Sequence, residues 1–302
     1  MDYTVSAKIK QEVVQMSHLQ YTANCHHLQY KVKQLSKICH WFYQNYCPEA
    51  IKHRHNVKWA HVSDESLLTL LVLQAELGIK SQRHFYQMCH LFCLEKRLER
   101  SRFNRRSQNL IWLIQLIRQG LNQQIPADSI VIIDSFPLPL CQPVRNHRVK
   151  ILNGLADIGY NASKQMWFYG FKVHMLVTLS GYILNYVVTP ASVHDIRAVD
   201  ELLENCRQPF ILGDLGYLSQ SLKEELIKRG YHLWTPWRQN MQGSTEHNNW
   251  KLLAMRRTIE TRFSELCSLF GIEHTWARGL AGIQLMLEQI ILTYNLSYFI
   301  VN

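Results

Sequence analysis

Apolar residues recur every three to four positions through roughly the first 125 residues of the chain. This spacing places apolar side chains on one face of an α-helix. The stretch contains one proline, Pro48, before Pro126 closes it, and proline is the residue that most strongly interrupts helices. We therefore expect residues 1–125 to form an all-helical region.

Within this region, one segment predicts two consecutive helices joined by a tight turn. Leucines between Leu67 and Leu73 follow helical spacing, and Gly78 and Ser81 supply a turn and a helix cap before the pattern resumes at Phe85. This is the outline of a helix-turn-helix, although plain α-hairpins share it. DNA binding is favoured by basic residues at and after the second helix, namely Lys80, Arg83, Arg105 and Arg106.

The pattern changes to β-strands after Pro126. Residues 129–134 form a short β-branched run that ends in Asp134, which is typical of a strand buried on both faces. Residues 166–177 and 182–189 are two extended runs on either side of the turn dipeptide Ser180-Gly181, and they predict a hairpin. A second domain therefore begins near residue 126.

Helices and strands alternate in the remainder of the chain. Ser192 and Asp195 have the spacing of a capping box that opens a helix through Leu203. The following segments predict a strand at 210–214, a helix at 219–229, a strand at 231–234 and a helix at 248–270 that ends at Gly271. The order βββαβαβα predicts an α/β domain over residues 126–302, with a mixed sheet and flanking helices.

Composition favours a polyanionic partner. The 33 Lys and Arg exceed the 23 Asp and Glu, which gives a net charge of +10, and 47% apolar residues are enough for a large core. No signal-peptide core or apolar run of about 18 residues is present, because Gln284, Glu288 and Asn295 interrupt the C-terminal apolar stretch. We expect nucleic acid rather than a membrane as the partner.

The eight cysteines predict reduced thiols in a cytoplasmic protein. Cys89, His90 and Cys93 suggest zinc at first sight, but no second Cys/His pair lies at finger spacing. Cys89 and Cys93 are one turn apart in an apolar helical stretch, where buried thiols are common. We therefore predict no zinc site there.

Three carboxylates are the candidate catalytic groups. Asp134 and Asp214 each follow a short apolar strand, and functional groups gather at the carboxyl ends of such strands. Glu260 lies beside the apolar face of the helix predicted at 248–270, one turn after Arg256. Each alone has an ordinary structural role, as a turn cap for an Asp or an i,i+4 partner of Arg256 for the Glu. Asp195 and Asp157 are weaker candidates, since Asp195 is expected to complete the capping box and Asp157 to lie in a loop.

Carboxylate oxygens are ligands for hard cations, so these three residues predict a site for Mg²⁺ or Mn²⁺. A pair of such ions activates an attacking oxygen and stabilises a leaving oxygen in phosphoryl transfer. Ser135 and Cys141 lack identifiable His and acid partners, which argues against a side-chain nucleophile. Lys172 and His174 share one strand face, which points either toward DNA or into a polar edge of the core.

Strand-Asp, strand-Asp and helix-Glu behind a basic helical region resembles bacterial insertion-sequence transposases of the DDE type, which have an RNase H-like catalytic domain. The resemblance covers nearly the whole chain. The segments that carry it are Ile132–Ser135, Tyr169–His174, Thr189–Asp195, Leu212–Tyr217 and Arg256–Phe263.

The resemblance implies metal binding by Asp134, Asp214 and Glu260 and a phosphate contact by Arg256. It also implies cleavage at terminal inverted repeats, strand transfer into target DNA, a homodimer that synapses two ends, and a place at the bacterial nucleoid. The family's Tyr three residues before the Arg and Lys seven after the Glu are replaced by Leu253 and Cys267, so the transposon-end contacts of that Tyr and Lys must come from elsewhere, and a hairpin intermediate is not implied.

Three other functions fit the same residues. A two-metal nuclease of the same fold would cut without strand transfer. A catalytically inert, domesticated DNA-binding protein would show no metal-dependent nicking, and a structural RNA-binding protein would show no preference for particular DNA ends.

Overall fold

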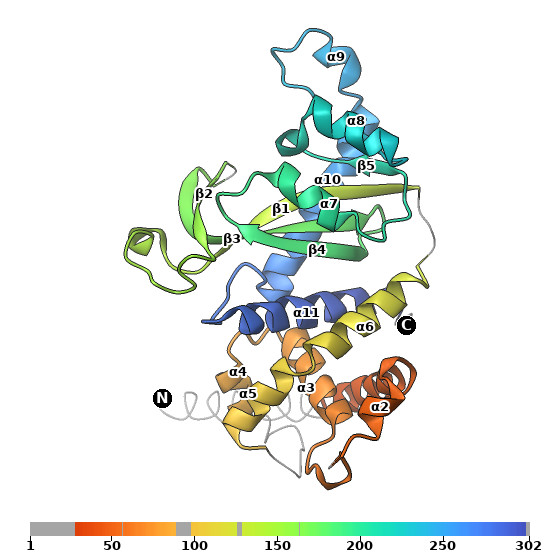
Figure 1. Ribbon diagram of the computed structural model, residues 1–302, viewed down its shortest axis with the longest axis vertical. Coiled ribbons are helices and arrows are strands. Elements are labelled where there is room, and N and C mark those ends of the chain that lie inside the picture. The colour runs from red at the N-terminus through yellow and green to blue at the C-terminus, as the bar shows by residue number, and fades with distance from the viewer. Residues whose placement is uncertain (1–27, 56, 89–97, 126–128, 163, 300–302) are drawn as a thin grey trace, which may run out of the picture. The chain divides into compact units, whose positions relative to one another are not determined.

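The computed structural model describes residues 28–55, 57–88, 98–125, 129–162 and 164–299 (Figure 1). The chain divides into two compact units. The first comprises Met1–Gln74 and Ser81–Leu113, and the second comprises Ala75–Lys80 and Ile114–Asn302. The sequence boundary at residue 125 differs from this division, because most of helix α6 (Ile111–Asn122) belongs to the second unit. Cys89, His90 and Cys93 lie outside the described residues.

The described part of the first unit is helical. It consists of a helix over residues 28–46, α2 (Glu49–Lys52), a 3-10 turn (Val57–Trp59), α3 (Asp64–Glu76), α4 (Gln82–Met88) and α5 (Arg100–Gln108). The predicted pair is present as α3 and α4. Gly78 between them has φ +62°, which L side chains rarely adopt, and Ser81 Oγ accepts the His84 N–H at 3.2 Å.

An ion-pair network stabilises the first unit. Asp64 at the start of α3 is buried, and its two carboxylate oxygens accept from Arg54 and Arg106 at 2.6 Å each. Arg106 also donates to the carbonyl of Val62 at 2.8 Å. A buried carboxylate is costly unless it is paired and hydrogen-bonded, so these two guanidinium groups are what makes Asp64 tolerable.

A mixed six-stranded sheet forms the centre of the second unit, in the order β2-β3-β1-β5-β6 with β4 also paired to β3. The strands are β1 (Ile130–Pro139), β2 (Asp157–Asn161), β3 (Met166–Thr178), β4 (Ile183–Pro190), β5 (Phe210–Leu212) and β6 (His232–Trp234). β1 pairs antiparallel with β3 and parallel with β5. The predicted hairpin is β3 and β4.

Helices cover both faces of this sheet (Figure 1). They are α7 (Val199–Leu202), α8 (Gln220–Lys228), α10 (Trp250–Glu265) and α11 (Leu280–Leu296). The short helix α9 (Ser244–His247) lies beyond α8, at the top of the view in Figure 1. Side chains alternate along β1, so Ile132 and Phe136 pack with α10 and α11, while Val131 and Ile133 pack with α7 and α8. The mixed sheet with flanking helices behind an all-helical region confirms the predicted fold class.

Three details differ from the sequence expectation. β2 is a strand that the pattern does not reveal, and it contains Asp157, which is expected in a loop. Ser192 and Asp195 do not form a capping box. Instead, His194 caps a 3-10 turn (Asp195–Ala198) by accepting the Ile196 N–H, and only Val199–Leu202 is α-helical. The long helix predicted at 248–270 is α10 followed by a π-helical turn (Leu266–Phe270), and it ends at Gly271 with φ +62°.

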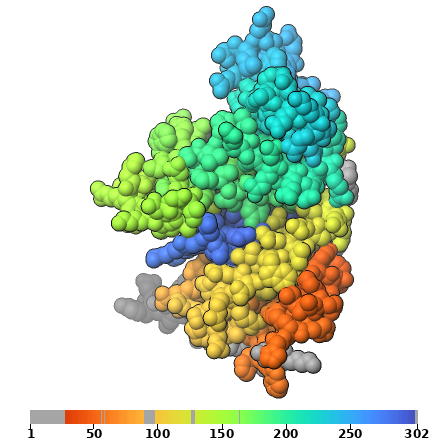
Figure 2. Space-filling view, in the orientation of Figure 1, coloured from red at the N-terminus to blue at the C-terminus, as the bar shows by residue number. Residues whose placement is uncertain are grey.

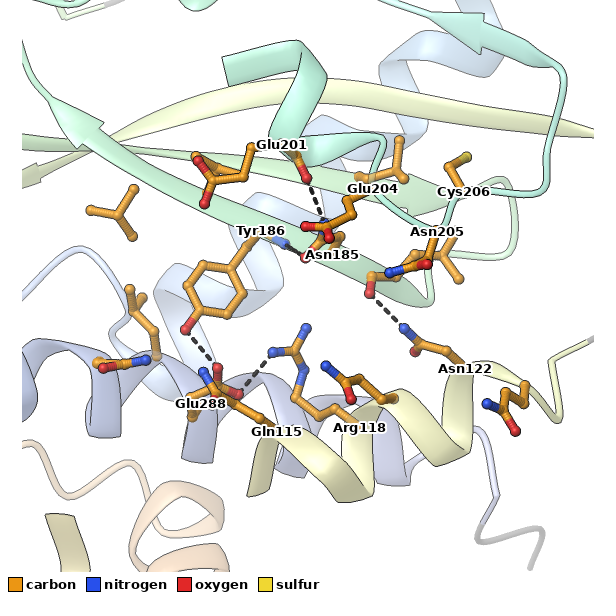
Figure 3. Close-up of a pocket in the computed structure, with 18 of the residues that line it drawn as sticks. Gln115, Arg118, Asn122, Asn185, Tyr186, Glu201, Glu204, Asn205, Cys206 and Glu288 are labelled. Atoms are coloured by element: carbon orange, nitrogen blue, oxygen red, sulfur yellow. Dashed lines mark hydrogen bonds and ion pairs between the residues drawn. The ribbon is translucent and has the colours of Figure 1, made fainter. Parts of the chain in front are cut away.

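Helix α11 contains the C-terminal apolar stretch that Gln284, Glu288 and Asn295 interrupt. Most of its residues are buried, and Asn295 forms a two-point contact with β4 through the Ile183 N–H at 3.1 Å and C=O at 2.8 Å. Glu288 accepts from Arg118 of α6 and from the Tyr186 hydroxyl, each at 2.8 Å (Figure 3). None of the helices described is long and apolar enough to span a bilayer.

Removing one partner of this buried pair should be far worse than removing both. Glu288→Ala leaves the buried Arg118 guanidinium uncompensated, so we expect a loss of about 3 to 5 kcal/mol in the free energy of unfolding. The double variant Arg118→Met with Glu288→Met should lose much less, because no buried charge is left over. Urea unfolding of both variants measures this, and equal losses would contradict it.

Candidate active site

The register of two strands places Asp134 beside Asp214. Ile132 of β1 is paired in parallel with Leu212 of β5, and in both segments an Asp follows two residues later. β5 ends at Leu212, so Asp214 follows in extended backbone and caps the next turn by accepting the Gly216 N–H at 2.8 Å. The two carboxylates therefore lie abreast at the end of the β1–β5 pair.

Both carboxylates resist ionisation in this position. Burial and, to a lesser extent, the negative charge of Asp214 raise the pKa of Asp134 to about 7, against the opposing effects of the Ser135 N–H and Arg256. Burial also raises the pKa of Asp214, against the hydrogen bond from Gly216. A pair of desolvated like charges is costly and is relieved by a proton or by a cation.

Arg256 connects Asp134 to Glu260 on the same face of the sheet. Its Nη1 lies 3.7 Å from Asp134 Oδ2, and its Nη2 donates to Glu260 Oε1 at 2.7 Å. α10 is positioned by its apolar stripe, in which Ile259 is buried and Phe263 packs on Phe136 of β1 with ring centroids 5.1 Å apart. Glu260 itself lies at the rim, with its side chain 57% exposed.

Asp195 is a fourth carboxylate at the site, although the sequence pattern favours it less than the other three. A Cβ at Gly216 would lie 2.7 Å from Asp195 Oδ2 and 3.0 Å from Asp214 Oδ1, so glycine is what lets the two carboxylates approach. Asp195 accepts from Lys172 Nζ at 2.5 Å, and its charge also raises the pKa of Asp134 and Asp214. The sequence signal for Asp195 is the segment Thr189–Asp195, which ends beside the sheet at the same point as the segment Leu212–Tyr217.

His174 lies on the opposite face of the sheet from Asp134 and is fully buried. Its Nδ1 is 3.3 Å from the Tyr217 hydroxyl and its Nε2 is 2.9 Å from Thr189 Oγ1. Burial lowers its pKa to about 4, so the ring is neutral near pH 7. Of the two possibilities for this strand face, His174 is directed into the core, where it supports the turn that follows Asp214, and Lys172 is paired with Asp195.

The basic residues predicted to contact DNA occupy several positions. Arg83 of α4 and Arg105 of α5 are exposed. Arg106 is paired with Asp64, and the Lys80 side chain lies against Gly271, which follows the π-helical turn after α10. Arg256 and Lys172 both lie at the carboxylate cluster.

A separate pocket of about 1200 Å³ lies between α6, α11 and β4, away from the carboxylates (Figure 3). Its polar centre is the Arg118–Glu288–Tyr186 network, in which the Glu288 carboxylate accepts from both of the other side chains. We assign this network a structural role.

Comparison with known proteins identifies the family. The family described as "Transposase DDE domain" matches residues 124–280, which is more than half of the chain. The chain belongs to this transposase family. No protein of curated function matches the sequence. A solved piggyBac transposase, described as a synaptic complex with hairpin DNA, is similar over 87% of this chain and 76% of that chain, with 14% identity and a TM-score of 0.46.

The matched part of the transposase contains every carboxylate of the cluster. It runs from before β1 to the start of α11, so Asp134, Asp195, Asp214 and Glu260 all fall within it, together with Arg256. The helices before residue 124 lie outside it. The cluster is thus located in the part of the chain that defines the transposase family.

The raised pKa of Asp134 has a consequence for stability. Because the pKa is 3.8 in the unfolded chain and about 7 in the folded protein, the free energy of unfolding decreases as the pH rises from the first value to the second. We expect Asp134→Asn to be more stable than the wild type above about pH 7, on the order of 2 to 4 kcal/mol, with the gap closing toward about pH 4.

Thermal melts in metal-free buffer across this pH range measure the difference. Asp157→Asn is the control, because Asp157 is exposed and a hydrogen bond from Ser192 lowers its pKa. That substitution should give no gain at any pH. A stability gap for Asp134→Asn that does not change with pH would contradict the interpretation.

Proposed function

We propose that this transposase cleaves DNA at the ends of a transposable element and joins the freed 3′ ends to target DNA, with Mg²⁺ or Mn²⁺ held by Asp134, Asp214 and Glu260. The observation that carries the proposal is the desolvated pair Asp134 and Asp214 at the end of the β1–β5 pair. Among the described cationic side chains, only Arg256 lies within 4 Å of either carboxylate, at 3.7 Å from Asp134.

The donor set fits a hard divalent cation. Such ions take carboxylate oxygens and leave positions open for water and phosphate. As the side chains stand, no three described His, Cys, Asp or Glu residues converge on one point. The ion would therefore be held first by Asp134 and Asp214, with the third ligand from Glu260 across Arg256 or from Asp195 beside Gly216.

When bound, the metal would activate the attacking oxygen and stabilise the leaving oxygen in an in-line displacement at phosphorus. The protein's own residues supply position and charge. Arg256 can exchange its carboxylate partners for a phosphate oxygen, because a guanidinium group matches both. Lys172 neutralises Asp195, which limits the negative charge that an approaching phosphate meets. His174 is buried and neutral, so its contribution is to hold Tyr217 and the turn after Asp214.

Metal binding should be visible without any catalytic assay. A ligand that binds only the folded state raises stability by about 2.7 kcal/mol at one hundred times its Kd. We expect Mg²⁺ or Mn²⁺ to raise the melting temperature of the wild type, and Asp134→Asn and Asp214→Asn to lose this rise together with nicking of DNA. Both variants should still bind DNA, since the Asn side chain keeps the size and removes the repelling charge.

The same melts identify the third ligand. If Glu260 is the ligand, Glu260→Gln reduces the metal-induced rise and Asp195→Asn does not, and the reverse outcome would assign Asp195. The exposed Glu225 of α8 provides the control Glu225→Gln, which should behave as the wild type. A full metal response in Asp134→Asn would refute the proposed site.

Strand transfer separates this proposal from a nuclease of the same fold. Both enzymes would nick a duplex that carries the element's end. Only a transposase joins a pre-cut 3′ end to a supercoiled plasmid, so recovery of joined products decides between them. The proposal also includes a homodimer, because two transposon ends are joined in one reaction.

We further propose that the helical region, residues 1–125, recognises the transposon ends through the α3–α4 pair and the arginines of α5. Arg83 and Arg105 are exposed, as phosphate contacts require, whereas Arg106 pairs with buried Asp64. The basic balance of the chain supports an acidic partner.

Substitution of the exposed arginines and substitution of Arg106 should therefore have different effects, the first on DNA binding and the second on stability. Arg83→Ala with Arg105→Ala should weaken binding to end-containing duplexes and leave the melting temperature unchanged. Arg106→Ala should lower stability by roughly 1 to 3 kcal/mol, because Asp64 loses one of its two partners. Competition binding and melts of the same preparations measure both. Normal end binding by the double variant would place recognition elsewhere.

A further inference from the structure

One part of the second unit is almost free of negative charge. The sixty residues from Ser135 to His194 contain a single acidic residue, Asp157. Their loop between β1 and β2 carries Arg145, Arg148 and Lys150, all exposed. None of these three lies within 4 Å of a carboxylate among the residues described, whereas Lys164 and Lys172 elsewhere in the sixty are paired with Glu273 and Asp195. The loop thus presents three uncompensated cations.

The loop is fixed to the sheet. Asn146 is buried, and its side chain donates to the Trp167 C=O at 3.0 Å and accepts the Tyr169 N–H at 3.2 Å. The Tyr169 hydroxyl donates to the Ile151 C=O at 2.9 Å. Two anchors on β3 therefore hold the ends of a short basic segment, 145–150, in one position.

An aromatic pair borders this segment. Tyr160 of β2 and Trp167 of β3 are directly paired across the strands, with ring centroids 5.2 Å apart. They remain 50% and 60% exposed. Two adjacent aromatic rings left in water beside three cations match the mixture of stacking and phosphate contacts found in nucleic-acid binding surfaces. We call the loop 141–156 with Tyr160 and Trp167 the β2 platform.

The β2 platform and the carboxylate cluster lie at different points along strand β3. Trp167 and Tyr169 have the same parity on β3 as Phe171 and Met175, and Met175 is paired with Asp134. The aromatic pair is thus on the sheet face of Asp134, some eight residues along β3, or roughly 25 Å at about 3.3 Å per residue. Figure 2 shows the yellow-green segment as a lobe projecting at the left, and Figure 1 shows β2 at the same place.

We propose that the β2 platform binds duplex DNA roughly seven base pairs from the phosphate held at Asp134 and Asp214, since each pair adds about 3.4 Å. Arg145, Arg148 and Lys150 contact phosphates, and Tyr160 and Trp167 pack on sugars and exposed base edges. The inference rests on the proposed function, which supplies DNA as the substrate. The platform holds the duplex in line over the carboxylates.

The test is the salt dependence of binding to a duplex of arbitrary sequence, about 30 base pairs or roughly 100 Å long. Combining Arg145→Ala, Arg148→Ala and Lys150→Ala should reduce the slope of log K against log salt by about 2.7, or about 0.9 for each phosphate that the variant no longer neutralises. Asn146→Ala should weaken binding several-fold without changing the protein's charge, because the loop is no longer anchored to β3.

The matched control removes three exposed cations elsewhere in the same unit that, among the described residues, have no carboxylate within 4 Å, through Lys228→Ala, Arg238→Ala and Arg278→Ala. Its slope should stay within about 0.9 of the wild-type slope. An equal drop in the control would show diffuse attraction and overturn the proposal. So would an unchanged slope in the platform variant, or a change in oligomeric state with unchanged DNA affinity on Tyr160→Ala with Trp167→Ala, which would make this surface an interface between two copies.

This experiment is independent of catalysis. If the chain binds DNA through the platform but neither cuts nor joins it, the proposed function fails and the platform stands. If the chain cuts and joins DNA while the platform variant keeps the wild-type slope, the proposed function stands and the platform proposal fails. Ethylation interference with the wild type should mark phosphates roughly seven base pairs from the transposon end, and the platform variant should lose those marks alone.

Discussion

The short parallel pairing between β1 and β5 is the constraint on which the site depends. Three residue pairs fix the register, and that register forces Asp134 and Asp214 into the same desolvated corner. Nothing local makes this arrangement favourable, because both carboxylates lose water and repel each other. The sheet tolerates the two neighbouring carboxylates because β1 is also paired antiparallel with β3 over nine residue pairs, and apolar layers cover both faces. The fold thus supplies the energy that keeps two like charges together.

Other features of the second unit follow from that corner. Gly216 leaves room for the carboxylates, and Lys172 and Arg256 limit the accumulated charge at its two sides. His174 and Tyr217 fill the opposite face of the sheet with a neutral, hydrogen-bonded pair. The apolar stripe of helix α10 packs against the sheet and fixes the rotation of the helix about its own axis, which places Glu260 at the rim of the site. The residues that surround the acids are therefore arranged by packing and by charge compensation at once.

Periodicity and turn chemistry are sufficient to predict most of the fold. The two strands that end in Asp, the hairpin at Ser180-Gly181 and the apolar stripe of α10 all depend on neighbours close in sequence. The place of Asp195 at the site is hard to predict because its partners, Lys172 and the Gly216 turn, lie 23 and 21 residues away. Sequence alone does not distinguish Arg106 from Arg105, since the partner of Arg106, Asp64, is 42 residues distant. β2 escapes prediction because it is short and only Gly159 is buried, with Asp157 and Tyr160 exposed on opposite faces, so it has neither an apolar run nor a regular apolar-polar alternation.

The register of β1 with β5 also sets an order of assembly. Asp134 and Asp214 are far apart in sequence, with strands β2, β3 and β4 between them. Strand pairing over such a sequence separation forms late, because a long loop of intervening chain must be closed first. During synthesis, a ribosome that has released β1 through β4 has not yet delivered Asp214, Arg256 or Glu260. A prematurely terminated product that ends before β5 would thus contain the basic loop and the hairpin without an assembled acidic centre. Translation itself delays the appearance of the proposed catalytic site until α10 has been synthesised.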